Sequence, residues 1–168
     1  VASVPEQTPD GLMRTNLANS IPDNLHVGIF GGGWRYWTRY FPKLESRLQS
    51  AGQLSIAEVN QIYNQSKILI NFHSTSHTTS LSLRTYDIAL AGAFQITDYR
   101  DDFSLLFPKD FFPLYGNIKE MNEQIAYWLS RDREREKHAL RAREYVLAHH
   151  TWLHRAKEIL KVYEGYRK

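Results

Sequence analysis

The sequence contains no cysteine among its 168 residues, which excludes a disulfide framework and a thiolate metal site. It has no apolar run near the roughly 20 residues that a membrane span needs, so no membrane span is expected. The opening residues VASVPEQTPDG lack the basic and then apolar pattern of a signal peptide. These absences suit a reducing compartment, and we expect a cytoplasmic protein. The chain begins with Val1 instead of a methionine, as expected either of a fragment of a longer protein or of a chain whose start has been trimmed.

The chain also has little excess of positive over negative charge, since its formal net charge is only +3. This balance would help an anionic ligand but falls short of the basic surface of a nucleic-acid-binding protein. The most arginine-rich stretch, RDREREKHALRARE, interleaves its arginines with acids, which is typical of a solvated helix face. No nucleic-acid partner is therefore expected.

Apolar residues are plentiful: 42% of the chain is hydrophobic and 13% is aromatic, as in globular proteins with a proper core. Short apolar stretches alternate with stretches of helical spacing, which predicts βαβ units and right-handed crossovers. The predicted strands are NLHVGIF, a very short QL at 53–54, KILINF, AFQIT and FFPLY. The expected fold class is α/β, a Rossmann-like parallel sheet flanked by helices, with a helical C-terminal tail.

Three parts are expected along the chain. Residues 1–24 form an arm and a short helix, residues 25–130 form the Rossmann-like domain, and residues 131–168 form helices that pack on it. Within the domain, a helix is predicted after Pro42, and Ser55 with Glu58 has the spacing of a capping box.

The stretch SLSLRTYDIALAGAFQITDYR at 80–100 follows the predicted strand KILINF and therefore lies at the carboxyl edge of the sheet, where such folds bind ligands. Free amides and the dipole at a helix start attract anions. Ser80 and Ser82 add hydroxyl donors, and Arg84 adds a charged fork for phosphate oxygens. Asp87 lies one turn later on the same face and suits a vicinal diol such as that of a ribose. The alternative is a surface Arg–Asp pair beside an ordinary cap.

Three further features are weaker candidates for ligand contacts. The glycines of GIFGGGW, with Gly32 and Gly33 at their centre, either admit a ligand to the backbone or form a tight turn, and they do not match G-x-G-x-x-G. Arg35 lies in an aromatic and basic cluster that lines either a groove or the core. His73 faces the expected phosphates or bonds to the backbone. The histidines show no H-E-x-x-H motif, so no metal is expected.

Four segments carry a resemblance to a known family: IYNQSKILINFH, SLRTYDIALAGAFQITDYRDDFSLLF, YWLSRDRERE and VLAHHTWLHRAKEIL. In this order they resemble the C-terminal, donor-binding domain of GT-B glycosyltransferases, in particular the CgeB-like and glycosyltransferase group 1 families. The similarity covers roughly residues 52–160.

The resemblance implies one half of a GT-B fold that binds a nucleotide-sugar donor. Ser80, Ser82, Leu83 and Arg84 would bind the diphosphate without a metal or other cofactor. Asp87 would bind the ribose where the family normally has a glutamate. Gln53 and Leu54 would lie near the base.

The resemblance also implies a missing N-terminal acceptor-binding domain, against which the last helix would pack. The expected function is therefore metal-independent transfer of a sugar from a nucleoside-diphosphate sugar to an acceptor, with the fragment inactive alone. Because the side chain of Asp87 is one methylene shorter than the family's glutamate, a second function is also considered, that of a non-catalytic nucleotide-binding or assembly module. A dehydrogenase ranks third, because the glycine loop lacks its acidic partner.

Overall fold

The computed structural model describes residues 4–5, 7–76 and 78–166. Parts of the expected N-terminal arm, of the loop at 72–79 and of the expected last helix lie outside this range. Within the described residues the strands form two separate parallel sheets: β1 pairs with β2 in one, and β4 lies between β3 and β5 in the other. Their bounds are β1 (Ile29–Phe30), β2 (Leu48–Ser50), β3 (Leu69–Asn71), β4 (Gln95–Asp98) and β5 (Leu114–Tyr115).

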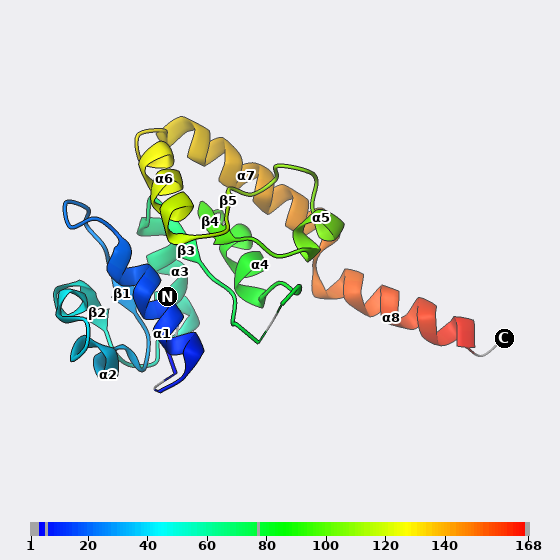
Figure 1. Ribbon diagram of the computed structural model, residues 1–168. Coiled ribbons are helices and arrows are strands. Elements are labelled where there is room, and N and C mark those ends of the chain that lie inside the picture. The colour runs from blue at the N-terminus through cyan, green and yellow to red at the C-terminus, as the bar shows by residue number, and fades with distance from the viewer. Residues whose placement is uncertain (1–3, 6, 77, 167–168) are drawn as a thin grey trace.

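Helices connect the strands and cover both faces of the β3–β4–β5 sheet, with α6 on one side and α4 on the other (Figure 1). The helices are α1 (Pro9–Ser20), α2 (Trp34–Thr38), the 3₁₀ helix η1 (Pro42–Arg47), α3 (Ile56–Gln65), α4 (Leu83–Leu90), α5 (Asp102–Leu106), α6 (Ile118–Leu129), α7 (Asp132–His149) and α8 (Trp152–Tyr166). The expected Rossmann-like α/β architecture with a helical C-terminal tail is confirmed.

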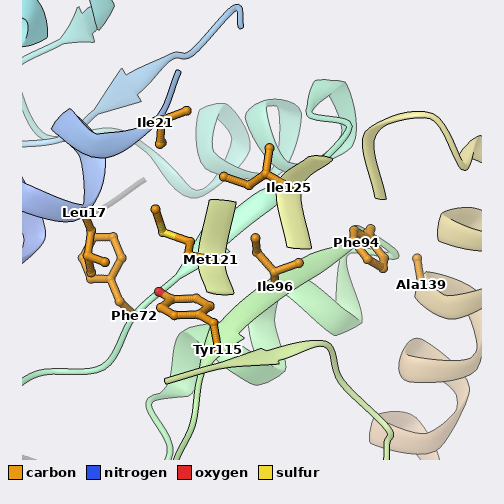
Figure 2. Packing of buried hydrophobic residues seen from close by; sticks show 9 residues of the cluster. All are labelled: Leu17, Ile21, Phe72, Phe94, Ile96, Tyr115, Met121, Ile125 and Ala139. Atoms are coloured by element: carbon orange, nitrogen blue, oxygen red, sulfur yellow. The ribbon is translucent and has the colours of Figure 1, made fainter. Parts of the chain in front are cut away.

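The main core lies between the sheet, α1 and α6. Met121 and Ile125 of α6 pack on Ile96 of β4, and Leu17 of α1 closes the cluster (Figure 2). Met121 and Ile96 are fully buried. The hydroxyl of Tyr115 donates to the backbone oxygen of Asn71 at 3.0 Å, which ties β5 to β3 across the sheet.

Local start signals place the helices well. The predicted capping box opens α3: the Ser55 hydroxyl accepts from the Glu58 amide, and the Glu58 carboxylate accepts from the Ser55 amide at 2.7 Å. Asn117 caps α6 in the same way by accepting from the Glu120 amide. Such caps satisfy amides that have no partner within the helix.

The segment after Pro42 differs from its prediction. The structure has the short 3₁₀ helix η1 followed at once by β2, and no strand at 53–54. Arg47 explains the change, because its buried guanidinium reaches back to the carbonyl oxygens of Ala18 and Ile21, each at 2.8 Å. This long-range contact stops the helix at Arg47 and leaves Leu48 to pair with Ile29 of β1.

The two C-terminal helices behave differently. Ala139, Ala142 and Val146 of α7 are buried, and the small residues let α7 approach α4 closely. In contrast, no residue of α8 is buried, and this helix extends away from the body (Figure 1). Among the described residues, no helix has both the length and the apolar character required to cross a bilayer.

Candidate functional site

A hollow of about 510 Å³ opens at the start of α4, beside the carboxyl end of β3. It is lined by Tyr63, Leu81, Ser82, Leu83, Arg84 and Asp87. Four of these residues, from Ser82 to Asp87, were predicted from the sequence as ligand contacts. Ser80 lies two residues before the helix cap and is half-buried outside this lining.

The first turn of α4 favours an anion. Ser82 is the N-cap residue in an extended conformation, but its side chain makes no capping hydrogen bond. Its Oγ atom is buried and has no hydrogen-bond partner in the part of the chain that the structure describes. The first turn contains no acidic residue, so Arg84 and the positive end of the helix dipole set its charge. A ligand oxygen at this position would satisfy the Ser82 hydroxyl and the helix amides together.

Arg84 and Asp87 face the same hollow. Burial raises the pKa of the Asp87 carboxyl above its usual value, and the charge of Arg84 opposes this rise. The ion pairs near the site join Arg14 to Asp10 and Arg100 to Asp98. Within the described residues no ion pair of this kind involves Arg84 or Asp87. Arg84 and Asp87 thus line the hollow together without forming an ion pair with each other.

His73 does not line the hollow. Its side chain is fully buried, and Nδ1 lies 2.6 Å from Oδ1 of Asp98. Because a carboxylate only accepts, Nδ1 carries a proton. The other ring nitrogen, Nε2, lies 3.3 Å from the hydroxyl of Thr85. Both nitrogens are thus engaged within the protein, and this geometry suits a supporting role.

Thr85 links His73 to a buried polar network under α4. The side-chain amide of Asn71 donates to Thr85 Oγ1 at 3.0 Å and to the Gln95 side chain at 3.1 Å. Gln95 in turn donates to the backbone oxygen of Thr85 at 2.8 Å. These bonds join α4 to β3 and β4 and fix the rotation of the helix about its axis. That rotation determines where the neighbouring Arg84 points.

Replacing Thr85 by valine keeps the shape of the side chain but removes the hydroxyl that Asn71 and His73 contact. We expect Thr85→Val to destabilise the protein by about 1–3 kcal/mol, because it leaves buried polar groups without a partner. The midpoint of thermal unfolding measures the effect. Thr97→Val is the matched control, since the Thr97 hydroxyl is buried without a partner among the described residues, and this change is expected to be neutral or stabilising. Equal midpoints for the two variants would contradict the network.

The weaker candidates lie away from the hollow. Gly33 begins α2 with φ of 83°, and a Cβ atom there would lie 1.8 Å from the backbone oxygen of Val4. This close approach favours the tight-turn interpretation of the glycine loop. Arg35 and Gln53 are exposed and Leu54 is half-buried; none of them lines the hollow.

Arg14 is a charged residue near the site that the sequence pattern did not reveal. It lies in α1, is 9% exposed, and its Nε is 2.7 Å from Asp10. Its guanidinium stacks on the Phe72 ring at 5.2 Å. Burial lowers the pKa of Arg14, and the positive charge of Arg84 contributes in the same direction. The packing of α1 therefore places a second guanidinium within electrostatic reach of Arg84.

The described residues contain no group of three or more His, Asp or Glu side chains placed to hold a metal ion.

A second hollow of about 740 Å³ lies between α6, α7 and the loop before β5, with Trp128, His138 and Glu123 in its lining. Burial, together with the charge of Arg141, lowers the pKa of His138 to about 4. His138 is therefore neutral at physiological pH, and this hollow offers no cation to a phosphate.

The comparisons with known proteins point to one family. Residues 13–161 match the model of a family described as Glycosyl transferase-like. The match includes every residue that lines the hollow at α4. A search of curated proteins found no match.

Proposed function

The chain belongs to the glycosyl transferase-like family, and we propose that its hollow at α4 binds the nucleoside-diphosphate sugar from which the glycosyl group is transferred. The observation that carries this proposal is the joint placement of Ser82, Arg84 and Asp87 around one hollow. Ser82 and Arg84 supply donors for the diphosphate, and Asp87 supplies an acceptor for the ribose diol. Glycosyl transfer in general is the activity of the family; donor binding at this hollow is our assignment.

The same residues would assist the chemical step. When the glycosyl group leaves, negative charge develops on the departing nucleoside diphosphate. Arg84 and the amides at the start of α4 face this charge from fixed positions, which stabilises the transition state more than the ground state. A metal ion is not required for this role, and we propose a metal-independent transfer.

A second domain would complete the enzyme. The apolar residues exposed on α8 include Trp152, Leu153, Ile159, Leu160 and Tyr163. They recur at helical spacing on one face, which is the pattern of a surface that is normally covered. We propose that the N-terminal acceptor-binding domain of a GT-B, CgeB-like enzyme covers this face. We expect residues 1–168 alone to bind the donor without transferring it, because the opposing wall that positions the acceptor is absent.

Calorimetric titration of the purified chain with UDP, GDP and dTDP, and with their sugar derivatives, tests the proposal. We expect at least one of these diphosphates to bind with 1:1 stoichiometry and more tightly than its nucleoside. Binding of none of them, or equal affinity for the nucleoside and its diphosphate, would rule out the assigned donor site.

Asp87→Asn should weaken binding of the nucleoside and its diphosphate by the same factor, because the neutral amide is a poorer acceptor for the diol. The affinity of the wild-type chain should also fall as the pH is lowered through the raised pKa of Asp87, since the protonated acid is a poorer acceptor too. Titrations between about pH 4 and pH 7.5 measure both effects. The asparagine variant should lose most of this pH dependence, and an unchanged dependence would show that another group is responsible.

A further inference from the structure

Tyr63 is the residue of the hollow that comes from a different helix. It lies near the end of α3, and it lines the hollow together with Arg84 and Asp87 of α4. Its ring packs on Leu69 of β3 and Ile88 of α4, and the residue is 6% exposed. The ring is therefore held rigidly against the sheet, and the position of its hydroxyl is fixed by the core.

The Tyr63 hydroxyl has no hydrogen-bond partner within residues 4–5, 7–76 and 78–166. Its oxygen remains accessible to solvent, because it is absent from the buried polar atoms without a partner. Buried tyrosines usually satisfy this group. Tyr115, for example, donates to Asn71 O at 3.0 Å. Burial raises the pKa of Tyr63, and the charges of Arg84 and Asp87 also act on it. The hydroxyl is therefore an uncharged, unsatisfied donor that lies within electrostatic reach of the two charged residues of the hollow.

A vicinal diol needs both a hydrogen-bond acceptor and a hydrogen-bond donor in its binding site. Each diol hydroxyl donates one hydrogen bond and accepts others. The Asp87 carboxylate can only accept, so it engages the diol protons and leaves the diol oxygens without a donor. A rigid phenol hydroxyl in the same hollow supplies that donor at little entropic cost, because tyrosine has few rotatable bonds.

We propose that Tyr63 contacts the ligand directly and, with Asp87, forms a donor–acceptor pair that recognises the ribose diol. This inference rests on the proposed donor site. It makes Tyr63 a specificity-determining residue that selects ribose over deoxyribose, a role beyond its contribution to the core.

The test is Tyr63→Phe, which keeps the ring and its packing and removes only the hydroxyl. UDP, GDP and their 2′,3′-dideoxy counterparts are titrated into both proteins. We expect the variant to bind the preferred ribonucleoside diphosphate about three- to tenfold more weakly, as for the loss of one neutral hydrogen bond. The dideoxy ligand should bind both proteins equally.

Tyr86→Phe is the matched control, because Tyr86 lies on the same helix as Arg84 but its ring contacts Phe107 and His150 outside the hollow. We expect wild-type affinity for this control and similar unfolding midpoints for all three proteins. Wild-type affinity in Tyr63→Phe, or an equal loss with the dideoxy ligand, would overturn the inference and leave the donor site standing. Binding of dTDP, which lacks the 2′-hydroxyl, in place of UDP and GDP would also overturn the inference. Failure of the wild-type chain to bind any of the three diphosphates would overturn the donor site and the inference with it.

Discussion

Arg84→Ala is expected to weaken binding of the nucleoside diphosphate by roughly ten- to a hundredfold. The change removes a charge-assisted contact, worth about 1.5–3 kcal/mol, from a site whose first helical turn holds no other charged residue. The bare nucleoside carries no phosphate, so its affinity should change little. Calorimetric titration of both ligands into both proteins measures this difference.

The control for general charge effects is Arg133→Ala, which removes an exposed arginine from α7, outside the hollow. It should bind both ligands like the wild-type protein. Unfolding midpoints must accompany the affinities, because Arg84 lies beside the buried Thr85. A loss of affinity that is equal for nucleoside and diphosphate would contradict a phosphate-binding role for Arg84.

Met121→Ala is expected to have the largest effect on stability. Met121 is fully buried in the cluster between α6, α1 and the sheet (Figure 2). Its truncation removes apolar contacts and leaves a cavity, at a cost of about 2–5 kcal/mol. For a chain of this size each kcal/mol lowers the unfolding midpoint by about 2–4 °C. Differential scanning calorimetry measures the shift.

The other methionine of the sequence, Met13, offers a matched control. Met13 of α1 packs against the same cluster but is only partly buried, so Met13→Ala should cost clearly less than Met121→Ala. Equal losses for the two variants would contradict the position of the core between α6 and the sheet.

The elements that the sequence predicted correctly depend on local chemistry. The Ser55–Glu58 capping box and the Asn117 cap are signals within one turn, and both appear in the structure. The apolar run before His73 forms β3, as predicted. Ser82, Leu83, Arg84 and Asp87 come together because they lie at the cap and in the first two turns of one helix.

The features that the sequence did not predict depend on contacts between distant segments. The early end of η1 follows from Arg47 reaching α1, and no local pattern encodes that partner. Arg14 approaches the site through the packing of α1, and Tyr63 through the packing of α3 on α4. The burial of His73 follows from its pairing with Asp98, which is 25 residues away. A single sequence shows such residues as ordinary helix or loop positions.

The central claim is that the hollow at the start of α4 binds a nucleoside diphosphate. Chemical-shift mapping of backbone amides in the ¹⁵N-labelled chain, titrated with the diphosphate that binds tightest, tests it most directly. We predict that the largest shifts fall on Ser82 to Asp87 and on the end of α3 around Tyr63. Shifts centred on the second hollow, around Trp128 and His138, or none above those of a phosphate-only titration, would contradict the claim.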